Sequence, residues 1–345
     1  MATPRVLVVG LGGTIAMTTT NSGGVAPTLS AQQLVDAVPG LADTDVELDV
    51  LTFRNRPGAS VTMDDLTELM AVIAEHLESG AAGAVITQGT DTIEESAYVL
   101  DLLHAGPQPV VVTGAMRNPT LAGADGPANL LAAITVAASP AARDLGCVVV
   151  LADEVHAARR VRKTHSTSVA TFTSPNGGPL GYLVEGRPQI VNRPTHRYPL
   201  PPPSASPNVG LYTATLGDDG SLVAVVAGQV DGLVMAGFGV GHVPEHWLPM
   251  LTEAAARIPV VLASRTGSGP VLTSTYGFPG SERDLVGRGL IPCGLLHPYK
   301  ARILLHLALA AGANHEQIAA AFAAAGEVTD DARWPWSASA QIPGW

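Results

Sequence analysis

Two threonine-bearing turns are the residues of this chain best suited to chemistry. One is Gly12-Gly13-Thr14-Ile15-Ala16 and the other is Gln88-Gly89-Thr90-Asp91-Thr92. Each follows an aliphatic run that predicts a buried strand, so its hydroxyl is expected at the carboxyl edge of a sheet, where ligands bind in open α/β folds. The glycines allow a substrate to approach the backbone closely. The pattern indicates nucleophilic chemistry through a threonine hydroxyl.

The second turn suits a ligand that carries both charges. Asp91 lies just before a predicted helix, whose start near Thr92 is marked by Glu95 three residues on, a capping-box signal. A carboxylate there can bind an ammonium, while the free N–H groups of the helix start can bind a carboxylate. Such a site fits an α-amino acid. The alternative is that Asp91 simply caps the helix.

A dinucleotide site is a weaker interpretation of the first turn. In Gly10-Leu11-Gly12-Gly13-Thr14-Ile15 the sixth position holds Ile15, where a small residue is needed for close packing of the helix. Residues 17–25 have no apolar period and predict a mobile loop, whereas a nucleotide-binding turn opens a helix. A nicotinamide enzyme is therefore disfavoured.

Composition excludes several classes of protein. The chain has 345 residues, 46% of them hydrophobic and 14% charged, which excludes a disordered chain and allows two domains. Its formal net charge of −11 argues against nucleic acid or an anionic membrane as a partner. No apolar run is long enough to span a bilayer and no leader is recognisable, so a cytoplasmic protein is expected. Cys147 and Cys293 are expected to be core residues.

Strand and helix patterns alternate along the chain, which predicts an α/β fold with parallel sheets. A Pro-rich stretch at residues 199–208 predicts a stiff linker. We therefore expect two α/β domains: a larger N-terminal parallel-sheet domain with a hairpin, residues 1–198, and a smaller flavodoxin-like domain, residues 209–345. Strands are expected at residues 6–9, 46–53, 83–87, 109–113, 146–151, 209–213, 232–236 and 259–263, and a hairpin at 180–191. Helices are expected at residues 62–78, 92–103, 129–138, 298–309 and 315–324, and two more are expected to begin at residues 30 and 244.

Several blocks in this order resemble the bacterial-type L-asparaginases of the asparaginase/glutaminase family, and they cover nearly the whole chain. One such block alone would be weak, but so many in family order are specific. The blocks are residues 11–16 (LGGTIA), 87–92 (TQGTDT), 114–117 (GAMR), 124–130 (ADGPANL), 163–164 (KT), 169–172 (VATF), 276–283 (YGFPGSER) and 300–302 (KAR).

The resemblance implies a reaction and its catalytic residues. L-asparagine and water would give L-aspartate and ammonia, with Thr14 as the nucleophile that forms an acyl-enzyme. Thr90, Asp91 and Lys163 would form a second triad in which Lys163 is the base. A lysine can serve as a base only where its surroundings lower its proton affinity. Two alternatives stay open: a glutaminase-asparaginase with broader amide specificity, and a weakly active, amino-acid-binding regulatory relative.

The resemblance also implies how the substrate is held. Ser60 would bind its carboxylate and Asp91 its ammonium, while the Ala115 carbonyl would accept from the leaving amide. Backbone N–H groups around Gly13, Thr14, Gly89 and Thr90 would contact the substrate and form an oxyanion hole. Glu282, and with it His242, would come from a neighbouring subunit, so the chain is expected to be a homo-oligomer, a dimer or a dimer of dimers. No cofactor and no metal are expected.

The chain departs from the family pattern near both turns. Leu11 stands where the family usually has Thr, Gln88 where it has His, and His242 where it often has Asn. The family places a Tyr after the first turn to polarise the threonine, and residues 17–29 contain none. What activates Thr14 is therefore an open question, and this motivates the regulatory alternative.

Overall fold

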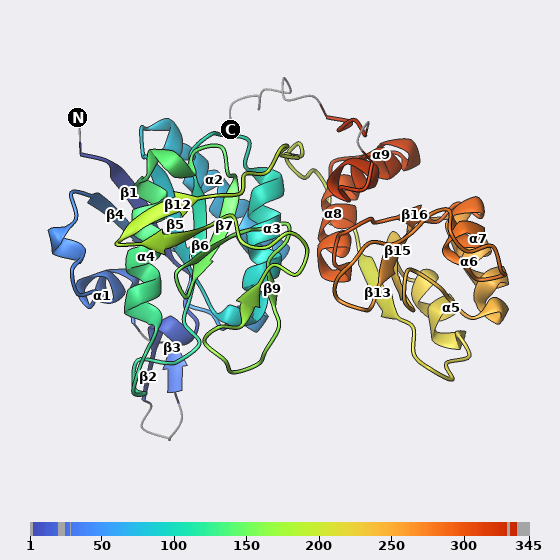
Figure 1. The fold of residues 1–345 in the computed structure, drawn as a ribbon, viewed down its shortest axis with the longest axis horizontal. Helices are drawn as coiled ribbons and strands as arrows, with labels where there is room; N and C mark the ends of the chain where they lie inside the picture. The colour runs from blue at the N-terminus through green and yellow to red at the C-terminus, as the bar shows by residue number, and fades with distance from the viewer. Residues whose placement is uncertain (1–2, 20–24, 28, 330–331, 337–345) are drawn as a thin grey trace. The chain divides into compact units, whose positions relative to one another are not determined.

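The protein is described by a computed structural model that covers residues 3–19, 25–27, 29–329 and 332–336 (Figure 1). The chain forms two compact units, which divide between Pro199 and Leu200. Each unit is a parallel-dominated α/β structure, so the predicted fold class is confirmed.

Unit 1 is built on an eight-stranded sheet in the order β12-β11-β8-β7-β6-β5-β1-β4 (Figure 1). The five strands from β7 to β4 are parallel, and β8, β11 and β12 extend the sheet with antiparallel pairs. The hairpin expected at residues 180–191 is β11–β12. The strands are β1 (Arg5–Gly10), β4 (Glu47–Thr52), β5 (Gly83–Thr87), β6 (Val110–Thr113), β7 (Cys147–Leu151), β8 (Glu154–Ala157), β11 (Gly181–Val184) and β12 (Arg187–Ile190).

Among the described residues, unit 1 has four α-helices. Two of them, α1 (Ala31–Asp36) and α4 (Gly126–Ala138), bury Leu34, Leu130 and other apolar residues against one face of the sheet. The others, α2 (Met63–Glu78) and α3 (Ile93–Leu103), pack against each other and the sheet. The capping box predicted at Ser30 is formed, and Thr62 caps α2 in the same way.

Two local expectations near the turns are wrong. Residues 17–25 were expected to form a loop, but at the ends of this stretch β2 (Met17–Thr19) pairs with β3 (Val25–Pro27) in an antiparallel ladder. Residues 20–24 lie outside the described residues. Thr92 was expected to cap α3 with its side chain, and no such bond forms. Its Oγ1 instead donates to the Gly58 carbonyl at 2.9 Å. A long-range contact therefore replaces the local one that a sequence pattern can show.

Unit 2 carries a parallel four-stranded sheet in the order β13-β14-β15-β16. Three of its strands lie where the sequence placed them, whereas β16 and the helices α5 and α7 were not expected. Its elements are β13 (Val209–Thr213), α5 (Ser221–Ala227), β14 (Gly232–Gly237), α6 (Leu248–Ala255), β15 (Val260–Ser264), α7 (Glu282–Gly287), β16 (Ile291–Pro292), α8 (Pro298–Ala310) and α9 (His315–Ala325).

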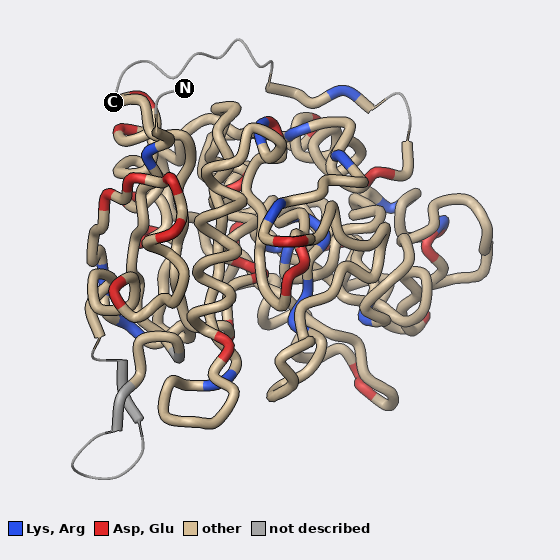
Figure 2. The backbone as a smooth tube through the Cα atoms, turned by 60° about the vertical axis from the view of Figure 1, so that its left-hand side comes forward, with Lys and Arg blue, Asp and Glu red and all other residues tan. Residues whose placement is uncertain are grey.

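Several bulk expectations can be compared with the structure. Cys147 and Cys293 are both buried, as expected of core residues. Acidic and basic residues are interspersed along the described chain (Figure 2). Among the described residues, no helix has both the length and the apolarity needed to cross a membrane.

His104, directly after α3, is a buried titratable group of unit 1. Its Nε2 lies 2.7 Å from the Gln108 carbonyl, so the neutral ring donates there. The Arg197 guanidinium donates to the carbonyls of His104 and Gly106. Burial, and then the charge of Arg197, lower the pKa of His104 to about 4. A proton on this ring is therefore unfavourable in the folded state.

We expect acid to destabilise unit 1 through His104. In the unfolded chain the ring titrates near the ordinary pKa of 6.5 and in the folded chain near 4, so stability is unaffected above pH 6.5 and falls as the pH drops toward 4. The free energy of unfolding should drop by about 2 kcal/mol between pH 7 and pH 5. This change in the free energy of unfolding can be measured by hydrogen exchange of peptides from β6 and β7, corrected for the pH dependence of the intrinsic exchange rates.

The variant His104→Gln keeps a side-chain N–H but does not titrate, so its acid sensitivity should be smaller by that amount. The exposed His196 provides the control, and His196→Gln should behave like the wild type. Equal pH dependence in wild type and His104→Gln would contradict the assignment.

Candidate active site

The second threonine turn follows β5 directly. Gln88 and Gly89 leave the strand, and Thr90 opens a single 3-10 turn, residues 90–92, before α3 begins. The Thr90 side chain is buried, whereas the Asp91 side chain is 66% exposed. The turn therefore presents a hydroxyl from inside the fold and a carboxylate at its surface.

Lys163 reaches this turn from a short antiparallel pair, β9 (Arg162–Lys163) and β10 (Phe172–Thr173). Its Nζ lies 3.0 Å from Thr90 Oγ1 and 3.0 Å from Asp91 Oδ1. The Lys163 side chain is only 15% exposed. The amine is thus held between the hydroxyl and the carboxylate, in hydrogen-bond contact with both, which is the geometry that a proton transfer requires.

Two further groups hold the strand that carries Lys163. The buried Glu94, in the first turn of α3, accepts from the Lys163 backbone N–H at 3.3 Å. Beyond β9, the backbone N–H and the Oγ1 of Thr164 both donate to the Thr171 carbonyl, each at 2.9 Å. The sequence had drawn attention to Glu95 as a cap, yet Glu94 is the residue that faces inward.

Three turns meet at glycine backbones. A Cβ placed on Gly13 would lie 2.0 Å from the Gly89 nitrogen, and one on Gly58 would lie 2.8 Å from the Gly89 carbonyl oxygen. Because real Cβ atoms do not approach so closely, glycine is required at these contacts. The turns before Thr14, Ser60 and Thr90 therefore lie in backbone contact.

The first turn is the one that carries Thr14. Leu11 donates from its backbone N–H to the Thr87 carbonyl at 2.9 Å, which joins the ends of β1 and β5. Gly12 and Gly13 then take φ values of 99° and 87°, in the left-handed region. Thr14 opens a 3-10 turn over residues 14–16. Its side chain lies outside what the structure describes, so the expected nucleophile is placed by its backbone alone.

The turn after β6 closes on the same place. A Cβ on Gly114 would lie 2.6 Å from the Gln88 carbonyl oxygen, so this turn contacts the Thr90 turn. Asn129 donates to the Gly114 carbonyl at 3.0 Å, and the Asp125 carboxylate accepts from the backbone N–H of Met116 at 3.0 Å. The buried Ala115 lies between these two anchors.

Gln88 is completely buried beside Thr90. Its Nε2 lies 3.4 Å from the Gly89 carbonyl, 3.3 Å from Thr92 Oγ1 and 3.1 Å from Ser96 Oγ. The amide thus ties the strand end to the first turns of the helix that follows.

Glu282 and His242 lie in unit 2, where they contact each other. The Glu282 side chain is fully buried, and its Oε1 accepts from the backbone N–H groups of Thr275 at 3.0 Å and Tyr276 at 2.8 Å. Its Oε2 lies 3.1 Å from His242 Nε2. Burial by itself would raise the pKa of Glu282, but these hydrogen bonds outweigh burial and the pKa lies below its ordinary value.

Comparison with known proteins agrees with this architecture. The family model "Asparaginase, N-terminal" matches residues 5–196, and the model "Glutaminase/Asparaginase C-terminal domain" matches residues 208–322. The chain belongs to the asparaginase family. Among its relatives is a protein of Deinococcus radiodurans named "Probable L-asparaginase", 37% identical, with 92% of this chain and 97% of that protein aligned.

Two further members of the asparaginase family illustrate the likeness. "L-asparaginase 2" of Escherichia coli is 34% identical, with 92% of each chain aligned. The crystal structure of a probable cytoplasmic L-asparaginase from Campylobacter jejuni superposes with a TM-score of 0.82 at 32% identity, covering 92% of this chain and 99% of that one. The family resemblance inferred from the motifs is confirmed.

Within this asparaginase fold, the structure brings together most of the residues expected at the site. Gly13, Gly89, Thr90, Asp91 and Lys163 are joined by the contacts described above. The Ser60 turn abuts the Gly89 backbone through Gly58, and the Ala115 turn abuts the Gln88 carbonyl through Gly114. The anchors Glu94, Asp125 and Asn129 were not expected. Asp125 and Asn129 lie in a recognised motif, but a motif does not show that their side chains bond to a neighbouring turn.

We expect Gly13→Ala to destabilise the protein more than Gly80→Ala. Both glycines have positive φ, 87° and 99°, so alanine is strained at either by about 1–2 kcal/mol. Only at Gly13 does the added Cβ meet backbone, and overpacking of that kind costs about 1–3 kcal/mol more. Thermal unfolding of the two variants measures the difference. Equal shifts in midpoint would show that the Gly13 turn moves freely away from Gly89.

Proposed function

We propose that this chain hydrolyses the side-chain amide of L-asparagine to L-aspartate and ammonia. The observation that supports this best is the Lys163 amine, 3.0 Å from both Thr90 Oγ1 and Asp91 Oδ1, in a chain of the asparaginase family. Its relatives named L-asparaginase align over nearly the whole chain. The substrate is carried over from those relatives.

In the proposed mechanism Thr14 is the nucleophile. Its hydroxyl oxygen attacks the amide carbon, the C–N bond breaks, and ammonia leaves with the threonine proton, which gives an acyl-enzyme ester. Water then attacks the ester and returns the hydroxyl to Thr14. Lys163 is the base in our proposal, with Thr90 in hydrogen-bond contact to relay the proton.

The substrate is proposed to lie against the meeting point of the turns. Asp91 binds the α-ammonium, because its carboxylate is 66% exposed and has acceptor capacity beyond its pair with Lys163. Ser60 binds the α-carboxylate, and the Ala115 carbonyl accepts from the leaving amide. Backbone N–H groups around Gly13 and Gly89 form the oxyanion hole, where each donor contributes about 3–4 kcal/mol.

Oligomeric state and location complete the proposal. We propose a homo-oligomer, a dimer or a dimer of dimers, in which Glu282 and His242 lie next to a neighbouring subunit's site. A cytoplasmic location is supported by the name of the Campylobacter jejuni structure. A 34% identical protein of Haemophilus influenzae is instead named "Probable L-asparaginase periplasmic".

The decisive experiment is ammonia release from L-asparagine and L-glutamine. We expect wild type to release ammonia from L-asparagine, and Thr14→Ala and Thr90→Val to lower kcat about a thousandfold or more, since each removes a group that acts in the chemical steps. The control is Thr135→Val on α4, a partly buried threonine whose hydroxyl donates to the Leu131 carbonyl of the same helix at 2.8 Å. It should leave kcat unchanged.

Other outcomes separate the alternatives. Higher kcat/KM with L-glutamine would favour the broader amidase. Binding of L-asparagine without release of ammonia would reject the enzyme and favour a regulatory amino-acid-binding protein. Full activity in both threonine variants would reject the assigned residues while leaving the reaction standing.

A further inference from the structure

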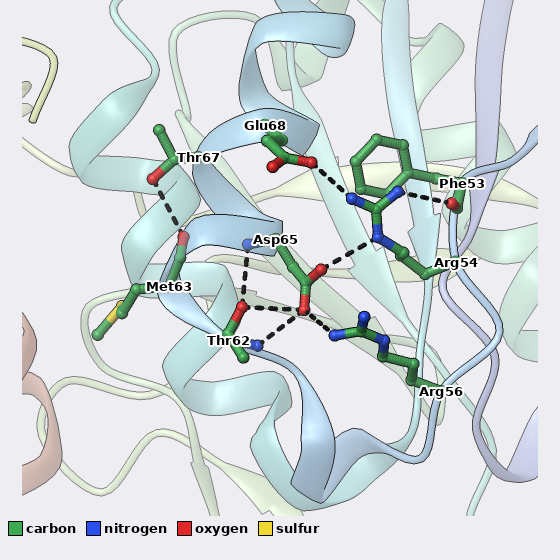
Figure 3. Close-up of polar contacts among 8 residues, drawn as sticks. All are labelled: Phe53, Arg54, Arg56, Thr62, Met63, Asp65, Thr67 and Glu68. Atoms are coloured by element: carbon green, nitrogen blue, oxygen red, sulfur yellow. Dashed lines mark hydrogen bonds and ion pairs between the residues drawn. The ribbon is translucent and has the colours of Figure 1, made fainter. Parts of the chain in front are cut away.

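One buried carboxylate gathers the segment that leads to Ser60. Asp65, in the first turn of α2, has a side chain only 7% exposed (Figure 3). Its Oδ1 accepts from Arg54 Nε at 3.1 Å. Its Oδ2 accepts from Arg56 Nη1 at 2.9 Å and from the Thr62 backbone N–H and Oγ1 at 3.1 and 3.0 Å. Four donors therefore converge on a single side chain.

The two arginines flank a stretch of chain that lies on the first threonine turn. The backbone N–H of Arg54 donates to the Gly10 carbonyl at 3.2 Å, and that of Arg56 donates to the Leu11 carbonyl at 2.9 Å. A Cβ on Gly12 would lie 2.8 Å from both the nitrogen and the oxygen of Arg56. The position of Arg56 is therefore coupled to the turn that carries Thr14.

The same stretch continues into the Ser60 turn. Residues 58–60 form one 3-10 turn, in which Ser60 donates from its backbone N–H to the Pro57 carbonyl at 2.9 Å. Gly58 contacts the Gly89 backbone, and its carbonyl accepts from Thr92 Oγ1. Only Pro57 separates Arg56 from this turn. Asp65 thus holds the chain before the Ser60 turn, through Arg54 and Arg56, and after it, through Thr62. The Thr90 turn contacts the start of the same turn at Gly58.

The charges explain why Asp65 can be an anchor. Burial alone would raise its pKa, but the hydrogen bonds from Thr62 and Arg54 and the charge of Arg56 outweigh burial, so the pKa lies below its ordinary value. Removing either side of a buried ion pair leaves the other charge buried and uncompensated, which strongly destabilises the folded state. Glu68 also pairs with Arg54, at 2.5 Å, but its side chain is 60% exposed. The contact of Arg54 with Asp65 is therefore the more buried of the two.

We propose that Asp65, through Arg54 and Arg56, is the positioning residue that fixes Ser60 for the α-carboxylate of the substrate, a role that rests on the proposed function. Asp65 itself touches no substrate, because its oxygens are occupied by the four donors. Its effect passes through the backbone of residues 54–60. The effect of Asp65 on substrate binding is consequently confined to the α-carboxylate, the group that Ser60 binds.

A simpler role for Asp65 is the capping box of α2, in which it accepts from the Thr62 N–H. The variant Asp65→Asn separates the two roles. Asparagine keeps an oxygen for the Thr62 N–H, but it loses the charge and turns an N–H₂ group toward one arginine donor. Capping is largely retained, while the bond from Arg54 Nε is lost and the bond from Arg56 is weakened by the loss of charge.

The test compares two substrates that differ only at the α-carboxylate: L-asparagine and 3-aminopropanamide. For Asp65→Asn we expect kcat/KM with L-asparagine to fall about 10- to 100-fold, mainly through KM, because the carboxylate binder is displaced. With 3-aminopropanamide kcat/KM should stay within about twofold of wild type, since that substrate has no carboxylate for Ser60 to hold. The matched control is Asp64→Asn, the same change at an exposed neighbour in the same helical turn.

Arg56→Met is the second variant, because it removes one of the two arginine contacts and leaves the cap of α2 intact. It should show the same substrate dependence with a smaller loss. Circular dichroism confirms that each variant is folded. Equal losses with both substrates, or no loss with L-asparagine in either variant, would overturn the positioning role while the proposed reaction stands.

The reaction and the positioning role can fail separately. If wild type releases no ammonia, the proposed reaction fails, and calorimetric binding of L-asparagine to wild type and Asp65→Asn replaces kinetics. Binding weakened about tenfold or more in Asp65→Asn would still support the positioning role. Unchanged binding, or no binding to wild type, would overturn it.

Discussion

The site depends on the direct contact of three glycine backbones. Gly13, Gly58 and Gly89 approach so closely that a single Cβ would fall within 2.0–2.8 Å of a neighbouring backbone atom. Because no side chain lies between the turns, their relative position is set by van der Waals contact between backbone atoms. The energy of this contact changes steeply over a short distance. Each of the three turns carries a residue assigned to the reaction: Thr14, Ser60 or Thr90. In the proposed mechanism, contacts between glycine backbones therefore position these three residues.

The glycines have no side chains that could hold the turns together. Side chains from the surrounding segments hold the turns instead. Asp65 holds the segment before Ser60, Glu94 holds the strand of Lys163, and Asn129 with Asp125 holds the Gly114 turn. All four side chains lie outside the residues assigned to catalysis. Buried, hydrogen-bonded polar groups such as Asp65 and Asn129 make an arrangement rigid and unique, which suits a site assembled from several turns.

The sequence predicts those features that depend on local pattern. Aliphatic runs located most strands of both sheets, although not β8 or β16. The capping box at Ser30 followed from two residues three apart. What could not be predicted depends on contacts distant in sequence. Thr92 has the local signal of a cap, but its hydroxyl donates to the carbonyl of a residue 34 positions away in the sequence. Lys163 was found only because its motif resembles a family, since nothing in its spacing shows that it lies beside Thr90, 73 residues earlier.

Two aspartates near the site show how burial decides what a carboxylate can do. Asp65 is 7% exposed, and its oxygens accept from four donors, one at Oδ1 and three at Oδ2. Its buried carboxylate is thus used to organise the backbone. Asp91 is 66% exposed and pairs with Lys163, so it retains capacity toward solvent. The same functional group therefore serves as an anchor in one place and is available for an ammonium in the other, according to its surroundings.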